Sequence, residues 1–360
     1  MCGDKVRVII SAGGTGGHIY PALSILKKIK EKEPDSEFLY IGTTSRMESE
    51  IVPKMGINYK GVNVIGLKRD LSIFKASHLF LRAISKCKKI IKEFNPDVVI
   101  GVGGYITAPV IYSAKKLGYK TIIHEQNSIP GKTNMFLGKY TDKVLVSLPG
   151  SVDKFKGDVV LTGNPRSEEA YFAKKLPKEQ FGLDKDKKLV LIVMGSLGST
   201  TITNSLLDII PMFKDKEYQV MIIAGKDYYD KYPKDLPKNV FVVPFLNNMV
   251  NLLKNVDIMV TRAGASTLAE ILAIGIPSIL VPSPYVANNH QMFNAQELVN
   301  NSAALLLEEK DFKSENLLKK IDLLFENSVL YKEIGENAKK LGIRNSSDKI
   351  YEEIKKTVRG

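Results

Sequence analysis

The stretch Val6–Ile29, VRVIISAGGTGGHIYPALSILKKI, decides the fold of the N-terminal half of the chain. An apolar, β-branched run leads into four glycines within five residues, Gly13–Gly17, and then into apolar residues at helical spacing. Glycine lets a backbone turn sharply and approach a ligand closely, so this succession predicts a strand, a tight turn and a helix. The amide groups and dipole at the start of such a helix suit a phosphate or another developing negative charge.

The same design returns in the second half. Residues 188–210, KLVLIVMGSLGSTTITNSLLDII, again predict a strand, a glycine-rich turn and a helix. Elsewhere short β-branched runs alternate with amphipathic segments, which is typical of parallel sheets covered by helices on both faces. We therefore predict an α/β protein with two doubly wound, Rossmann-like domains. Ligands bind at the carboxyl ends of parallel strands, so the active site is expected where the two domains face each other across a cleft.

Composition limits the class of protein. A chain of 360 residues is too long for one domain of usual size, and 44% hydrophobic with 25% charged residues is ordinary for a globular protein. The formal net charge of +13 favours anionic partners: phosphorylated ligands, acidic lipids or nucleic acid. Two cysteines make no disulfide framework, which favours a reducing cytoplasm, and no apolar run is long enough to predict a transmembrane helix.

The first glycine loop, Gly13–Gly17, matches neither of two familiar phosphate motifs. The dinucleotide fingerprint would need a third glycine at Ile19, and a Walker A loop would need lysine at His18. A tight turn without a ligand stays open as the alternative. A histidine alone is more often a capping or surface residue, but at the mouth of a sheet His18 is a candidate general base, because its pKa lies near working pH.

Polar or glycine-rich segments also follow other predicted strands. GVGGY (101–105) and HEQN (124–127) follow strands of the first half, MGSLGST (194–200) and RAGASTLAE (262–270) follow strands of the second, and NNHQMFNA (288–295) opens a later helix. The HEQN side chains indicate a sugar-binding lip, with a loop that satisfies its own hydrogen bonds as the alternative. Ser266 and Thr267 can cap the helix after Gly264, where a diphosphate would bind while Glu270 accepts hydrogen bonds from ribose. A plain capping box of Thr267 and Glu270 is the other interpretation.

A basic segment stands apart from these motifs. Between Lys68 and Lys92 it carries eight Lys or Arg residues against one acid, Asp70, with apolar residues such as Ile73 and Phe74 interleaved. Anionic lipid attracts such a surface, and Lys68, Arg69, Ile73, Phe74 and Lys75 are the expected membrane contacts. The alternative is an amphipathic helix that packs its apolar face on the sheet.

No metal site is expected. Asp184-Lys185-Asp186 has the Asp-x-Asp form of a metal–diphosphate site, but it lies in LDKDKK among lysines, where a solvated turn is the better interpretation. No His/Cys cluster has zinc spacing. Helix dipoles and side chains would then have to stabilise any departing diphosphate.

In this order and spacing, GGTGGHIYPA, GVGGY, HEQN, GNPR, GSLGS, RAGASTLAE and HQMFNA closely resemble the MurG family of bacterial peptidoglycan N-acetylglucosaminyltransferases. The resemblance covers nearly the whole chain. It implies the GT-B architecture, with an acceptor and membrane-side domain at 1–163, a UDP-sugar domain at 164–341, and a C-terminal helix, about 342–360, that packs back on the first domain. It implies UDP-N-acetylglucosamine as donor, lipid I as acceptor, no cofactor, inversion at the anomeric carbon, and a peripheral location on the cytoplasmic face of the cell membrane.

The resemblance also implies roles for individual residues. Carried over by position, the donor contacts fall on Thr15, Gly16, Gly17, Asn127, Arg166, Ser196, Leu246, Gly264, Ala265, Ser266, Thr267, Glu270 and Gln291. Leu246 would hold uracil through its backbone and Glu270 the ribose. The acceptor contacts would be Gly13, Gly14, Gly103, Gly104 and Tyr105. Two positions depart from the family pattern: Arg166 follows Pro165 directly, and His290 stands where a second glutamine often occurs.

This set of residues predicts a mechanism. The acceptor's 4-hydroxyl attacks the anomeric carbon opposite UDP, His18 removes its proton, and Glu125 is the second candidate base. A transferase for another lipid, such as diacylglycerol, is the enzyme alternative. A nucleic-acid or dinucleotide-binding protein is the alternative of another class, but the cations gather in one apolar-flanked segment and no nucleic-acid motif is present.

Overall fold

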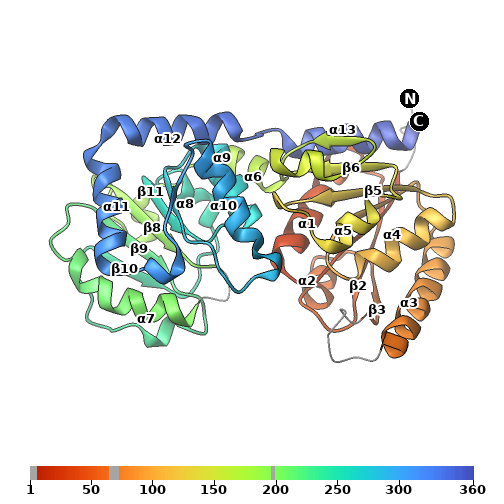
Figure 1. The fold of residues 1–360 in the computed structure, drawn as a ribbon, viewed down its shortest axis with the longest axis horizontal. Coiled ribbons are helices and arrows are strands. Elements are labelled where there is room, and N and C mark those ends of the chain that lie inside the picture. The colour runs from red at the N-terminus through yellow and green to blue at the C-terminus, as the bar shows by residue number, and fades with distance from the viewer. Residues whose placement is uncertain (1–5, 65–72, 196–198) are drawn as a thin grey trace. The chain divides into compact units, whose positions relative to one another are not determined.

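The computed structural model describes residues 6–64, 73–195 and 199–360 and divides into two compact units (Figure 1). The N-terminal unit comprises Met1–Arg166 together with Asn345–Gly360, and the C-terminal unit comprises Ser167–Arg344. Each is built around its own parallel sheet, so the predicted fold class of two Rossmann-like domains is confirmed.

The sheet of the N-terminal unit has seven strands in the order β3-β2-β1-β4-β5-β6-β7, and the pairings between neighbours are all parallel. The strand order reverses between β1 and β4, which is where doubly wound sheets bind their ligands. The strands are β1 (Arg7–Ala12), β2 (Glu37–Thr43), β3 (Tyr59–Val62), β4 (Val98–Gly103), β5 (Lys120–Glu125), β6 (Lys143–Val146) and β7 (Val159–Leu161).

Helices cover both faces of this sheet (Figure 1). The two faces of the central strands carry separate apolar clusters, one with Val8 and Ile10 and the other with Ile9 and Val99, because successive side chains of a strand point to opposite sides. The helices are α1 (Gly16–Lys32), α2 (Glu48–Lys54), α3 (Ile73–Phe94), α4 (Thr107–Lys116), α5 (Lys132–Leu137), the 3₁₀ turn η1 (Pro149–Lys154) and α13 (Ser346–Arg359).

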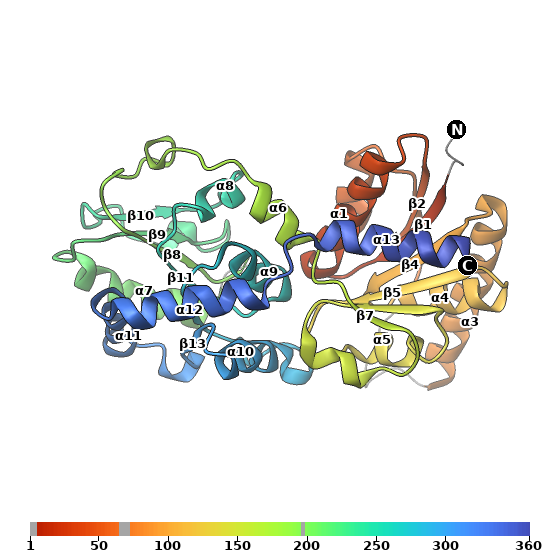
Figure 2. The same ribbon diagram turned by 90° about the horizontal axis from the view of Figure 1, so that it is seen from above.

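The last helix, α13, belongs to the N-terminal unit although it follows the whole C-terminal unit in sequence. It packs on α1 (Figure 2), and Ile350, Tyr351 and Ile354 join the apolar cluster of Val8 and Ile10. The Tyr351 hydroxyl donates to the Glu33 carboxylate (2.6 Å) just after α1. The core of this unit therefore depends on residues from both ends of the chain.

The C-terminal unit has six strands in the order β10-β9-β8-β11-β12-β13, again parallel throughout, with the reversal between β8 and β11. Its strands are β8 (Leu189–Val193), β9 (Gln219–Ile223), β10 (Val240–Val243), β11 (Ile258–Thr261), β12 (Ser278–Leu280) and β13 (Leu305–Leu306). Its helices are α6 (Arg166–Phe172), α7 (Thr200–Ile209), α8 (Met249–Leu253), α9 (Ala265–Ile274), α10 (His290–Asn300), α11 (Ser314–Glu326) and α12 (Ser328–Leu341), with 3₁₀ turns η2 (Lys178–Phe181), η3 (Ile210–Phe213), η4 (Tyr229–Lys231), η5 (Ala287–Asn289) and η6 (Glu309–Asp311).

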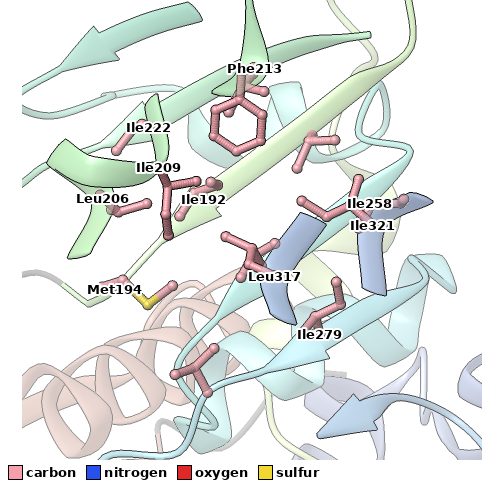
Figure 3. Close-up of a cluster of buried hydrophobic side chains, with 14 of the residues drawn as sticks. Ile192, Met194, Leu206, Ile209, Phe213, Ile222, Ile258, Ile279, Leu317 and Ile321 are labelled. Carbon is pink, nitrogen blue, oxygen red and sulfur yellow. The ribbon is translucent and has the colours of Figure 1, made fainter. Parts of the chain in front are cut away.

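The core of this unit is mostly aliphatic, with a few buried rings such as Phe213 and Phe312. Phe213 lies among isoleucines of β8, β9 and β11, and Leu317 and Ile321 of α11 join the same cluster (Figure 3). Near-continuous apolar strands such as LVLIV (189–193), buried along their whole length, explain why the sequence indicated a sheet covered on both faces.

Within the described residues, no helix is both long and apolar enough to cross a membrane.

Candidate active site

The first glycine loop follows β1 and packs beneath the start of α1. Gly13 is buried, and its amide donates to the Gly103 carbonyl (3.1 Å). The Gly14 amide donates to the Glu48 carboxylate (3.1 Å), at a backbone φ of +94° that favours glycine. Both amides therefore serve the loop itself. The acceptor contacts expected at Gly13 and Gly14 stay a prediction. Gly14, Thr15 and Gly17 are exposed and Gly16 is half-buried.

His18 is held in the first turn of α1 by this loop. Its Nδ1 lies 3.2 Å from the Gly13 carbonyl oxygen. A carbonyl only accepts, so Nδ1 carries the proton and the Nε2 lone pair is the basic one. The ring also rests on the Gly103 backbone: a Cβ built on Gly103 would lie 2.6 Å from His18 Cδ2 and 2.9 Å from Nε2. The tautomer and the orientation suit a general base.

The Gly103–Gly104 turn after β4 packs directly on the first loop. The two glycines have φ values of +117° and +89°, and a Cβ on Gly104 would overlap the Gly13 carbonyl group. The Thr107 hydroxyl donates to the Gly103 carbonyl (2.8 Å) and so ties the turn to α4. Tyr105, which follows the turn, is 63% exposed. The sequence predicted two glycine turns at one sheet edge, and the structure places them in contact.

Gly104→Ala tests this contact. We expect a loss of about 1–3 kcal/mol in the free energy of unfolding of the N-terminal unit, because the new methyl group overlaps the Gly13 backbone, together with a fall in kcat as His18 moves. Urea denaturation and steady-state kinetics measure the two effects. Gly118→Ala is the matched control: Gly118 also has positive φ, +85°, but a Cβ there meets nothing within 4 Å, so only the backbone strain of about 1 kcal/mol is expected. Equal losses in the two variants would contradict the packing role.

The HEQN segment at the end of β5 is built around a buried carboxylate. Glu125 is 2% exposed and accepts from the Asn127 amide (2.9 Å) and side chain (3.1 Å), the Gly131 amide (3.0 Å) and the Asn134 side chain (2.9 Å). Four donors converge on its two oxygens. Glu125 therefore shapes the loop that presents Asn127. Its role as the second candidate base stays a prediction, beside the alternative of a loop that satisfies its own hydrogen bonds.

His124 and Gln126 of the same segment point into the unit. His124 Nε2 donates to the Gly163 carbonyl (3.0 Å), and its Nδ1 accepts from the Gln126 amide (2.9 Å). Burial lowers the pKa of His124, so the imidazole is neutral. These contacts fasten β5 to the segment after β7, and His124 is not a candidate base.

In the C-terminal unit, the start of α9 gives the clearest anion-binding geometry. The helix begins at Ala265 with Gly264 as its N-cap, and no side chain caps it. Ser266 and Thr267 therefore lie in the first turn rather than at the cap, so the predicted side-chain capping is wrong and so is the alternative of a Thr267–Glu270 capping box. The Ser266 hydroxyl is buried with no hydrogen-bond partner in the described residues, and the first amides of a helix have none within the helix. Glu270 is 3% exposed, one turn further along.

Other predicted donor residues are spread over several segments of the chain. Gln291, in the first turn of α10, accepts from the Ser283 amide (2.9 Å) through Oε1, and Asn294 donates to the Ala263 carbonyl (3.1 Å). Leu246 lies between β10 and α8 and is half-buried. The amide of Arg166 donates to the Asn164 side chain (3.1 Å) at the start of α6, on the N-terminal unit's side of the division. Ser196 lies outside the described residues.

Nothing in the sequence indicated two buried charged features near these loops, Glu48 and the Arg262–Glu309 pair. Glu48 of α2 is fully buried under the first glycine loop. Arg262, after β11, pairs with Glu309 (2.7 Å) and donates to the Val281 carbonyl (3.1 Å), with both side chains buried. Arg262 and Glu309 are far apart in sequence, so no local spacing signals the pair.

The Asp-x-Asp sequence is an exposed turn, as expected. Asp184 accepts from the Asp186 amide (2.9 Å), and all three residues of the turn are exposed. In the part of the chain that the structure describes, no three His, Cys, Asp or Glu residues are grouped to hold a metal ion.

Two parallel sheets of Rossmann order give the fold of two nucleotide-binding-like units. Residues 8–146 match the glycosyltransferase family 28 N-terminal domain and residues 189–350 match the family 28 C-terminal domain, which together define a glycosyltransferase of the two-domain GT-B class. Within this class, the chain belongs to the MurG family.

Named relatives and solved structures support this assignment. A Bacillus cereus protein named UDP-N-acetylglucosamine--N-acetylmuramyl-(pentapeptide) pyrophosphoryl-undecaprenol N-acetylglucosamine transferase 1 is 44% identical over 98% of this chain and 100% of its own. A Pediococcus pentosaceus protein named as the same transferase is 43% identical over 97% of this chain and 99% of its own. The crystal structure of Acinetobacter baumannii MurG superposes with a TM-score of 0.79 at 26% identity and covers 98% of this chain and 99% of that one. A Staphylococcus aureus MnaA–UDP structure, at 16% identity and a TM-score of 0.69, shares the fold.

Proposed function

We propose that this chain transfers N-acetylglucosamine from UDP-N-acetylglucosamine to the 4-hydroxyl of the N-acetylmuramoyl-pentapeptide in lipid I, and so forms lipid II for peptidoglycan synthesis. One observation carries the proposal: full-length relatives at 43–45% identity are named for this transfer. The histidine tautomer in the N-terminal unit and the uncapped α9 start in the C-terminal unit are the groups that such a reaction requires.

On the acceptor side, His18 Nε2 takes the proton from the attacking hydroxyl. With the proton on Nδ1, the ring presents Nε2 for this step without rearrangement, because the Gly13 carbonyl accepts from Nδ1. The new bond forms between the acceptor oxygen and the anomeric carbon while the bond to UDP breaks, so the configuration inverts. Gly103 lies against the histidine ring and Gly104 against Gly13. These three glycines, Gly14 and Tyr105 are proposed to line the acceptor site.

On the donor side, the start of α9 neutralises the departing diphosphate. The amides of Ala265, Ser266 and Thr267 and the positive end of the helix dipole stabilise charge as it develops on UDP. Glu270 accepts from the ribose hydroxyls, the Leu246 backbone holds uracil, and Gln291 completes the site. Thr15, Gly16, Gly17, Asn127, Arg166 and Ser196 are proposed as further donor contacts.

A transfer assay tests the function. With radiolabelled UDP-N-acetylglucosamine and a lipid I analogue, we expect a labelled disaccharide lipid as the product, and with diacylglycerol no labelled lipid. Transfer to diacylglycerol and none to lipid I would replace the proposed acceptor. Binding of the labelled nucleotide without any transfer would remove the enzymatic assignment.

We further propose that the enzyme binds the inner face of the cell membrane peripherally through anionic lipids. Along the described part of α3, Ala83 and Cys87 face the sheet, while Arg82 and Lys86 are exposed, and Leu81 is 64% exposed beside them. This part of α3 is consistent with the alternative of an amphipathic helix that packs its apolar face on the sheet. Its cations remain exposed to solvent. Lys68 and Arg69, and the side chains of Ile73, Phe74 and Lys75, lie outside the described residues.

Charge reversal of Lys68, Arg69 and Lys75 to glutamate tests the membrane proposal. Each cation near an anionic surface contributes about 1 kcal/mol, so the triple variant is expected to bind phosphatidylglycerol vesicles about 100-fold more weakly, with wild-type binding falling as salt rises. Cosedimentation measures both. The control reverses three exposed lysines of the C-terminal unit, Lys174, Lys185 and Lys187. If both triple variants lose vesicle binding equally, the loss reflects net charge and not a specific membrane-binding segment.

A further inference from the structure

A buried carboxylate lies directly beneath the loop that carries His18. The side chain of Glu48 is fully buried at the start of α2. Its Oε2 accepts from the Gly14 amide (3.1 Å), and its Oε1 accepts from the Thr43 amide (3.1 Å) and hydroxyl (2.7 Å). One carboxylate thus joins the end of β2 to the first glycine loop, across 34 residues of sequence.

Space for this carboxylate is provided by two glycines. A Cβ on Gly13 would lie 2.6 Å from Glu48 Oε1, and a Cβ on Gly42 would lie 2.3 Å from the Tyr59 hydroxyl oxygen and 2.8 Å from Glu48 Cγ. A larger residue at Gly13 would press on the glutamate, and one at Gly42 would press on both Tyr59 and the glutamate. Gly13 and Gly42 therefore both have a reason to be glycine that involves Glu48 rather than a ligand.

The surroundings of Glu48 are strongly desolvated. Burial raises the pKa of Tyr40 and of Tyr59, and the nearby Glu48 charge raises both further. The Tyr40 hydroxyl donates to the Ala12 carbonyl (3.1 Å), one residue before the loop, and the Tyr59 hydroxyl donates to the Thr43 carbonyl. No ion pair with Glu48 occurs within residues 6–64, 73–195 and 199–360. Its hydrogen bonds to Gly14 and Thr43 are shielded from water, so losing one of them is costly.

The contacts continue from Glu48 to the base. Glu48 holds the Gly14 amide, the adjoining Gly13 carbonyl accepts from His18 Nδ1, and the Gly13 amide donates to the Gly103 carbonyl on which the histidine ring rests. A change at Glu48 reaches His18 through a single peptide unit. From this geometry we infer that Glu48 is a positioning residue for the transfer reaction: it fixes the first glycine loop so that His18 presents Nε2 to the acceptor hydroxyl. The inference rests on the proposed function.

Glu48→Gln tests the role with almost no change in shape. If the glutamine oxygen faces Thr43, its NH₂ group meets the Gly14 amide, and two donors then oppose each other. We expect kcat to fall roughly tenfold, as a loss of about 1.4 kcal/mol from transition-state stabilisation implies. The KM for UDP-N-acetylglucosamine should change less than kcat does, because the proposed donor contacts of the C-terminal unit lie outside this loop and those at Thr15, Gly16 and Gly17 lie beyond the Gly14 amide that Glu48 holds.

Thr43→Val is the matched control. It removes one hydrogen bond from the same carboxylate, on the side away from the loop, and leaves the Gly14 contact in place. Both variants are expected to lower the melting temperature by a few degrees, but Thr43→Val should keep kcat within twofold of wild type. Hydrogen exchange of a peptide spanning residues 12–18 gives a readout independent of activity: exchange should quicken in Glu48→Gln and not in Thr43→Val.

The outcomes separate the two proposals. A wild-type enzyme that transfers no sugar to the lipid I analogue overturns the proposed function. With an active wild type, a folded Glu48→Gln variant that keeps its kcat, or a Thr43→Val variant that loses as much, overturns the positioning role. Should Glu48→Gln fail to fold, Glu48→Asp serves instead, since its carboxylate is one methylene too short to span Thr43 and Gly14. A tenfold lower kcat with a smaller change in the donor KM supports the inference, and an unchanged kcat overturns it.

Discussion

Replacing His18 with alanine is expected to lower kcat by roughly 10²–10⁴-fold, the usual contribution of a positioned general base, while the affinity for UDP-N-acetylglucosamine changes little. The reason is geometric. His18 lies in the N-terminal unit, fixed by Gly13 and Gly103, and its basic Nε2 acts on the acceptor hydroxyl rather than on the nucleotide. Steady-state kinetics with the lipid I analogue, together with calorimetric titration of UDP, separate turnover from donor binding.

His18→Gln refines this result. A glutamine amide can still donate to the Gly13 carbonyl but cannot accept a proton at working pH, so we expect a loss close to that of alanine. His78→Ala, an exposed histidine on α3, is the control and should leave kcat unchanged. Turnover by His18→Gln near the wild-type level would mean that His18 orients the loop and that another group takes the proton.

Replacing Glu270 with alanine is expected to weaken the binding of UDP-N-acetylglucosamine by about 10–150-fold. Glu270 is 3% exposed one turn into α9, and hydrogen bonds to a charged acceptor contribute about 1.5–3 kcal/mol. The loss appears in the KM for the donor and in the Kd for UDP, since ribose remains bound both in the ground state and in the transition state. Calorimetric titration with UDP measures it directly.

Glu315→Ala is the matched control for charge. Glu315 is an exposed glutamate in the first turn of α11 in the same unit, and its removal should change the Kd for UDP by less than twofold. If the Glu270→Ala variant binds UDP as tightly as wild type, Glu270 does not bind the ribose. The proposed donor site would then lose its main side-chain contact.

Features that depend on neighbouring residues could be predicted from the sequence. The strand–glycine–helix succession at Val6–Ile29 and again at 188–210 predicted both Rossmann-like units, because periodicity and turn chemistry are properties of neighbouring residues. The position of the α9 start also followed from its sequence. The identity of the N-cap residue did not follow from the sequence. Serine and threonine are favoured N-caps, but the helix begins at Ala265, so Ser266 and Thr267 lie inside its first turn.

The rest of the site depends on contacts between distant segments. Nothing near Glu48 in MESEIVPK indicates that its carboxylate holds the Gly14 amide, and nothing near Glu125 indicates that four donors from its own loop would surround it. In both cases the carboxylate of an acidic residue supports a loop through hydrogen bonds. Such roles are set by tertiary hydrogen bonds that no local pattern encodes.

The placement of α13 has a consequence for how the chain is made. Ile350, Tyr351 and Ile354 complete the apolar cluster around Val8 and Ile10, so the unit whose synthesis starts first cannot be finished until about residue 354 has left the ribosome. In the unit spanning Ser167–Arg344, all strands precede α13 in the sequence and are synthesised before it. During translation, part of one face of the N-terminal sheet therefore stays uncovered until α13 has been made. The C-terminal unit can reach its native state before the N-terminal unit does.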